Sequence, residues 1–142
     1  MVHDAASEGS LEMPSVITRF NEAVLARNVS LTADLFAEDV RLYGVPWKPF
    51  EGKEAALTVF AMLHDIIEEL EYVAEYEGAD GVALRVRGIV GGREFDGVQL
   101  LRFNSEGLID ECRDLIRPHS AGTALREESA AYIERKAGRA AP

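Results

Sequence analysis

Residues 82–117 decide the fold of this chain. They read VALRVRGIV (82–90), GG (91–92), REFDGVQLLRF (93–103), NSEG (104–107) and LIDECRDLIR (108–117), and Pro118 follows. Apolar residues alternate with polar ones on a period of two, which is typical of strands with one buried face. The two short separating segments contain the Gly, Asn and Ser residues that tight turns favour. The stretch therefore predicts three antiparallel strands joined by two turns.

The segments around this meander predict helices and two further strands. Helical apolar spacing marks residues 14–28, 53–69 and 121–136, with Ser120 as the expected cap of the last helix. A short helix capped by Ser30 or Thr32 is expected to include Leu35 and Phe36, and residues 40–44 and 71–77 are expected to be strands. These elements predict an α+β fold, a cone made by a strongly curved mixed, mostly antiparallel β-sheet packed on about three N-terminal helices, with a C-terminal helix.

The domain organisation predicted for the 142 residues is simple. Residues 1–12 are small and polar and are expected to form a disordered tail, residues 13–137 one domain, and residues 138–142 a second tail. The interior of such a cone is apolar and would suit a small molecule.

Composition excludes several classes of partner. A formal net charge of −10 makes nucleic acid and anionic membranes poor partners. No apolar run approaches the ~20 residues of a membrane span, and the first ten residues lack the apolar stretch of a signal peptide. The single cysteine, Cys112, excludes an internal disulfide and a multi-cysteine metal site. We expect a soluble cytoplasmic protein with no metal and no cofactor.

Four short stretches carry a family resemblance. They are LFAEDV (35–40), PFEG (49–52), LRFNSEGLI (101–109) and CRDLIRP (112–118). With the order of elements, they resemble the nuclear-transport-factor-2-like superfamily, in particular its SnoaL-like and ketosteroid-isomerase-like branch. The resemblance covers roughly residues 15–124. It implies the cone fold, and it leaves the activity open because this superfamily contains isomerases, epoxide hydrolases, cyclases, dehydratases and non-catalytic modules.

The residues of ketosteroid isomerases are not retained. The resemblance aligns Phe20 with the isomerase tyrosine, Gly44 with the aspartate base and Gln99 with the protonated aspartic acid. Phe20 cannot donate a hydrogen bond and Gly44 cannot take a proton, whereas the Gln99 amide can still donate to an oxygen. The resemblance therefore argues against a ketosteroid isomerase mechanism.

One position matches limonene-type epoxide hydrolases. Arg113-Asp114 resembles the Arg-Asp pair on their last strand, so Asp114 carries over as a catalytic position. The partner residues should come from strand 82–90, where the apolar pattern turns Arg85 and Arg87 away from the pocket; a slip of one residue would turn both inward.

Three residues are the catalytic candidates. Asp114 shares a face with apolar residues, which would raise its pKa and suit it to acid or base work, unless it pairs with an arginine. Gln99 could orient a ligand oxygen or bond within the protein. His64, near the apolar stripe of its helix, could be a base or a partly exposed surface residue.

The remaining site candidates are apolar or aromatic residues expected to line the pocket. Trp47 and Phe50 lie in a loop beside its mouth, where they could gate a ligand or pack under the loop. The full set of substrate-binding candidates is Phe20, Leu42, Trp47, Phe50, Phe60, Leu84, Val86, Leu101, Phe103, Cys112 and Ile116.

Three functional hypotheses follow. The first is a protein that binds a small hydrophobic, oxygenated molecule, with cofactor-free acid–base chemistry if it is an enzyme. The second is a non-catalytic module that binds a ligand or partner. The third is a structural dimeric domain whose pocket is filled by its own phenylalanines. In each case the second, partly apolar face of the sheet predicts a homodimer.

Overall fold

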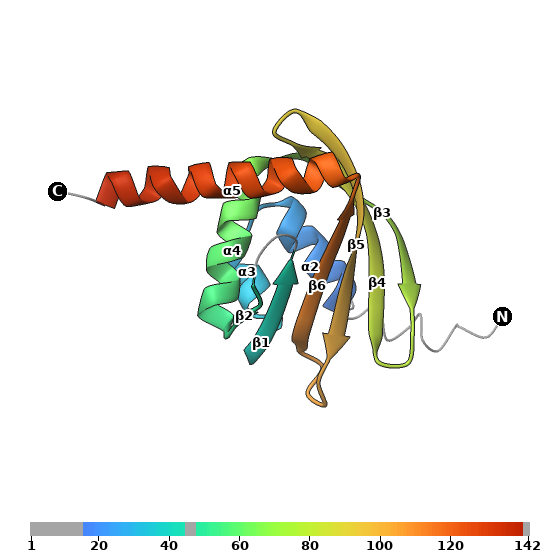
Figure 1. The fold of residues 1–142 in the computed structure, drawn as a ribbon. Helices are drawn as coiled ribbons and strands as arrows, with labels where there is room; N and C mark the ends of the chain where they lie inside the picture. Colours follow the sequence, from blue (N-terminus) through green and yellow to red (C-terminus); the bar gives the residue numbers. More distant parts are fainter. Residues whose placement is uncertain (1–15, 45–47, 141–142) are drawn as a thin grey trace.

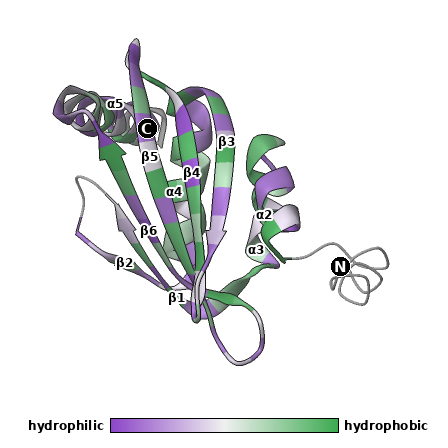
Figure 2. Cartoon of the chain, turned by 90° about the vertical axis from the view of Figure 1, so that its right-hand side faces the viewer, coloured by the Kyte–Doolittle hydropathy of each residue, from purple (hydrophilic) through white to green (hydrophobic). Residues whose placement is uncertain are grey.

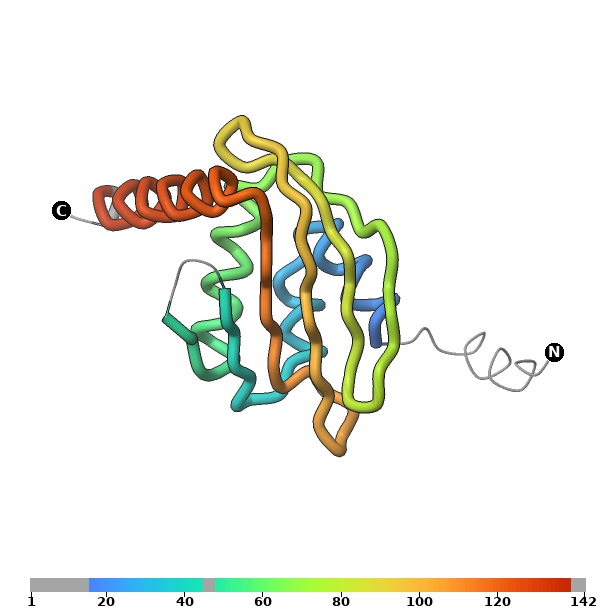
Figure 3. The backbone as a smooth tube through the Cα atoms, turned by 45° about the vertical axis from the view of Figure 1, so that its right-hand side comes forward, coloured from blue at the N-terminus to red at the C-terminus, as the bar shows by residue number. Residues whose placement is uncertain are grey.

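The computed structural model describes residues 16–44 and 48–140. Within them the elements follow in the order α2 (Val16–Leu25), α3 (Val29–Ala33), β1 (Phe36–Gly44), β2 (Phe50–Glu51), α4 (Lys53–Ile66), β3 (Ile67–Glu77), β4 (Gly81–Val90), β5 (Arg93–Phe103), β6 (Ile109–Arg117) and α5 (His119–Ala140). Helices α2, α3 and α4 lie on one face of a curved sheet, and α5 crosses its end and runs on past the body (Figures 1 and 3). The α+β fold predicted from the sequence is confirmed.

The six strands form one mixed sheet. Their order is β2-β1-β6-β5-β4-β3. Strand β1 runs parallel to β6, and the other neighbouring pairs are antiparallel. The predicted meander therefore forms one half of the sheet, and Asp114 of β6 lies between Gly44 of β1 and Gln99 of β5.

The alternation of the meander fixes which face is buried. Leu84, Val86 and Val90 of β4 are buried against the helices. Arg85 and Arg87 lie on the opposite face, which is the register that the apolar pattern favoured, and there they pair with Asp96 and Glu71. Figure 2 shows hydrophilic and hydrophobic positions alternating along these strands.

Several element boundaries differ from the predictions: Asn28 caps α3 in place of Ser30 or Thr32, and α5 already begins at His119. Pairing with a distant strand explains two further differences. Phe36 begins β1 instead of ending a helix, because the backbone N–H of Ile109 in β6 donates a hydrogen bond to the carbonyl oxygen of Leu35 at 2.8 Å. Helix α4 ends at Ile66, and Ile67 already pairs with Val90 of β4. In both places pairing with a distant strand supplies the backbone hydrogen bonds that a helix would otherwise make.

Three phenylalanines fill one end of the cone. Phe20, Phe36 and Phe60 come from α2, β1 and α4, and their ring centroids lie 5.5–6.4 Å apart. All three side chains are almost fully buried. The apolar interior at this end is therefore closed by packing.

Candidate functional site

A cavity of about 280 Å³ lies between the helices and the half of the sheet nearest α5. Its walls are mostly apolar, with Phe60 and Leu63 from α4, Val86 and Val90 from β4, and Ile116 from β6 among them. Five polar or charged residues also line it: Arg27, His64, Glu69, Gln99 and Asp114. All three predicted catalytic candidates are thus brought to one cavity.

Asp114 supplies a carboxyl group in an apolar setting. It points to the inner face of β6 between Cys112 and Ile116, because successive strand residues alternate in direction. The Cys112 thiol donates to Asp114 Oδ1 at 3.8 Å, and the side chain of Gln99, the register partner of Asp114 on β5, also favours the charged carboxylate. Burial raises the pKa of Asp114 to about 6, and the two polar neighbours Gln99 and Cys112 offset part of that rise.

No positive charge neutralises this carboxylate within the described residues. The neighbouring Arg113 points to the outer face, where its Nε lies 2.7 Å from Glu111 and its guanidinium lies 3.9 Å from the centre of the Tyr43 ring. A structural ion pair was the alternative role for Asp114, and the charge pairs of the described chain do not include it. A group with a pKa near 6 can take or give a proton close to neutral pH.

Tyr72 joins the site although the sequence did not mark it as a candidate. It lies on the inner face of β3, and its hydroxyl donates to Gln99 Oε1 at 2.9 Å. Burial, with the nearby Asp114 charge, raises the pKa of Tyr72 well above its ordinary value, so the hydroxyl stays neutral. The alternation of residues 71–77 placed Tyr72 on a strand, but only the order of the strands shows that its side chain reaches Gln99 across β4.

His64 presents two unpaired ring nitrogens. Both Nδ1 and Nε2 are buried and have no hydrogen-bond partner, and the ring lies 6.3 Å from that of Phe60. Burial and then the charge of Arg27 lower the pKa of His64, which favours the neutral ring. Arg27 itself donates to the backbone carbonyls of His64 and Ile67. A neutral imidazole can both donate to and accept from a ligand.

The other predicted pocket residues fall into two groups. Phe60, Val86 and Ile116 line the cavity. The structure places the remaining described candidates in or beside the packed core instead: Phe20, Leu42, Phe50, Leu84, Leu101, Phe103 and Cys112. The physical reason is that the rings of Phe20, Phe36 and Phe60 pack together at one end of the cone, so that end has no room for a ligand. Trp47 lies outside the described residues.

The described residues offer no group of three or more His, Cys, Asp or Glu side chains arranged to hold a metal ion. Among the same residues, no helix combines the length and the apolar character needed to cross a membrane.

Comparison with known proteins defines the class of protein. A family model described as a SnoaL-like domain matches residues 17–112. The chain therefore belongs to the SnoaL-like family, within the nuclear-transport-factor-2-like superfamily. A comparison with curated proteins found no match.

Solved structures share the fold over most of the chain. An uncharacterised bacterial protein with a cystatin-like fold from Silicibacter pomeroyi is 28% identical, with a TM-score of 0.82 over 88% of this chain and 89% of that one. A steroid delta-isomerase from Pseudomonas aeruginosa is 22% identical, with a TM-score of 0.81 over 87% and 92%. An epoxide hydrolase/cyclase-like enzyme of pyran ring formation in salinomycin is 18% identical, with a TM-score of 0.63 over 72% and 88%.

Proposed function

We propose that the cavity binds a small hydrophobic molecule bearing oxygen, and that Asp114 transfers a proton within it. The observation that carries this proposal is a carboxyl group with a pKa of about 6 in a mostly apolar cavity. Gln99, directly opposite on β5, would hold or polarise the oxygen through its amide. The reaction class is cofactor-free acid–base chemistry, which includes isomerisation, dehydration, cyclisation and epoxide opening.

The position of Asp114 supports an acid–base role. The resemblance to ketosteroid isomerases assigns their base to Gly44, which has no side chain. Asp114 lies on the neighbouring strand at the same level, since Gly44 and Asp114 are register partners of β1 and β6. A carboxyl group is thus available one strand away from the expected position.

A non-catalytic binding module is the second candidate. The replacement of two isomerase residues by Phe20 and Gly44 favours it, because neither can move a proton. In that case the cavity and His64 would serve recognition only.

A ligand screen followed by a turnover assay tests the proposal. Steroid enones, terpenoid epoxides and polyketide-like aromatics are added to the wild type, to Asp114→Asn, and to Asp65→Asn as the matched control on the exposed side of α4. We expect one class to raise the melting temperature of the wild type and the control, and to be converted by both. Loss of the proton-transfer group should lower conversion by Asp114→Asn by about 10²-fold or more.

The outcomes separate the two candidates. Unchanged conversion by Asp114→Asn would refute the catalytic assignment of this residue. Binding without conversion, insensitive to pH between about 5 and 8 across the titration range of Asp114, would favour the binding module.

A further inference from the structure

The Gln99 amide has two possible orientations, and its neighbours distinguish them. An amide presents an acceptor oxygen on one side and two N–H donors on the other. In the structure Oε1 accepts the hydrogen of the Tyr72 hydroxyl at 2.9 Å. The nitrogen side is then the side turned towards Asp114, the register partner of Gln99 on β6. The flipped amide would turn its oxygen towards a carboxylate, which repels it.

The sheet brings the three side chains into line. Gln99 and Asp114 are register partners of β5 and β6, and Leu84 of β4 is the partner of Gln99 on its other side. Tyr72 of β3 pairs with Val86, one inward-facing position along β4. The tyrosine therefore reaches across β4 on the inner face, and Tyr72, Gln99 and Asp114 form a chain over strands β3, β5 and β6.

We propose that Tyr72 is a positioning residue that locks the Gln99 amide with its N–H groups towards Asp114 and the cavity. One N–H then serves Asp114, and the second remains for an acceptor oxygen of the substrate, such as a carbonyl or an ether. This inference concerns the same site as the proposed function and deepens it, because it states which kind of oxygen Gln99 receives. A substrate group that can only donate a hydrogen bond has no partner on this amide.

The pKa of Asp114 reports on the orientation of the Gln99 amide, because a hydrogen bond donated by an N–H group to the carboxylate favours its charged form. Tyr72 and Cys112 are the titratable groups beside Asp114. Other charged or titratable groups on the cavity wall are Arg27, His64 and Glu69. None of them is changed in the test below, so their contributions cancel between the variants.

The first measurement uses the wild-type protein. The carboxyl carbon of Asp114 and the side-chain amide of Gln99 are followed by NMR from pH 4 to 8. We expect the Gln99 amide resonances to shift with the same midpoint as the Asp114 carboxyl, near pH 6. Gln99 resonances that stay constant while Asp114 titrates would overturn the proposal, and this result does not depend on any variant folding.

The second measurement is a double-mutant cycle. Tyr72→Phe removes the hydroxyl and frees the amide to turn, so the pKa of Asp114 should rise by roughly 0.5 to 1. Tyr76→Phe, on the exposed part of the same strand, is the matched control and should leave that pKa unchanged. In a Gln99→Leu background, Tyr72→Phe should have no further effect, because the tyrosine acts through the amide.

Two outcomes of the cycle would overturn the proposal. One is an unchanged Asp114 pKa in Tyr72→Phe; the other is an equal rise with and without Gln99, which would mean a direct effect of the hydroxyl on the carboxylate. Neither measurement needs a ligand or turnover. Failure of the positioning role of Tyr72 is therefore distinguishable from failure of the proposed function.

Discussion

At the scale of single residues, the burial of Asp114 gives the protein a group that titrates near neutral pH, and it lowers the stability of the fold when that group is charged. An aspartic acid in an unfolded chain has a pKa of about 3.9, whereas burial raises the pKa of Asp114 to about 6 in the folded protein. The folded state therefore binds this proton more tightly than the unfolded state. The resulting stabilisation is present in full below about pH 4, and it is lost as the pH rises through about 6.

Replacing Asp114 should reveal this cost as a pH-dependent gain in stability. We expect Asp114→Asn to unfold with a free energy that improves relative to the wild type by up to about 3 kcal/mol between pH 4 and pH 8. Chemical denaturation at both pH values measures the difference. Asp65→Asn removes an exposed carboxylate and should show no comparable gain. A constant difference between Asp114→Asn and the wild type at the two pH values would contradict a raised pKa.

At the scale of elements, close approach between strands shapes the cavity wall. Gly97 of β5 lies opposite Ile116 of β6. A Cβ atom at Gly97 would lie 2.4 Å from the carbonyl oxygen of Leu115 and 2.9 Å from Cγ2 of Ile116. Since Ile116 lines the cavity two residues after Asp114, the missing side chain of Gly97 helps to set the position of this part of β6.

Gly97→Ala should therefore destabilise the protein. We expect a loss of about 1–3 kcal/mol, because the added methyl group overpacks a rigid backbone contact. Gly78→Ala is the control: its Cβ would meet only the Gly81 carbonyl oxygen, at 3.8 Å. Urea denaturation of both variants measures the effect. Equal stability of Gly97→Ala and the wild type would show that β6 can move aside.

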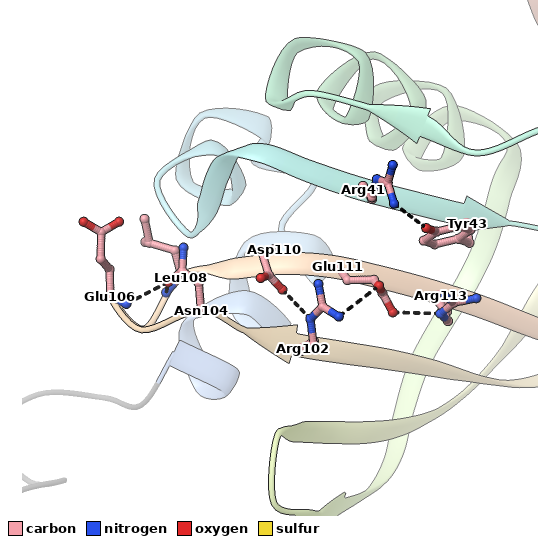
Figure 4. Close-up of polar contacts among 9 residues, drawn as sticks. All are labelled: Arg41, Tyr43, Arg102, Asn104, Glu106, Leu108, Asp110, Glu111 and Arg113. Carbon is pink, nitrogen blue, oxygen red and sulfur yellow. Dashed lines mark hydrogen bonds and ion pairs between the residues drawn. The ribbon is translucent and has the colours of Figure 1, made fainter.

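At the scale of the whole molecule, the outer face of the sheet differs from the inner one. Arginine and carboxylate side chains form ion pairs on the outer face. In one of them Arg102 Nε lies 2.9 Å from Asp110 Oδ1 (Figure 4). Large apolar side chains are exposed on the same face, with Leu100 at 37% and Leu115 at 52%. Exposed apolar groups bordered by ordered charge pairs are typical of a surface that another chain covers.

We expect this outer face to form a homodimer. Light scattering at micromolar concentration should give about twice the chain mass of 15.6 kDa. Leu115→Arg should shift the protein to the monomer, because two buried like charges would face each other across a two-fold interface. Ile133→Arg, at an exposed position of α5, is the control and should remain dimeric. A wild-type mass equal to that of one chain would contradict the prediction.

Local pattern was enough to predict the meander and to favour one orientation of its side chains. The period of two favoured Arg85 and Arg87 on the outer face and Asp114 and Gln99 on the inner face, because a strand alternates its side chains whatever its partners are. A slip of one residue would have reversed both sets, and the strand pairing in the structure fixes the register. The turns at Gly91 and Asn104 could be predicted for the same local reason. The strands and turns depend on neighbours in the chain, so local pattern was sufficient for them.

Tertiary packing decided what local pattern leaves open. The end of α4 at Ile66 depends on pairing between Ile67 and Val90, which are far apart in the sequence. The contact of Tyr72 with Gln99 depends on the order of the strands. The size of the cavity depends on how side chains from α2, β1 and α4 pack together. Phe20, Phe36 and Phe60 close one end of the cone, and the cavity beside Asp114 remains.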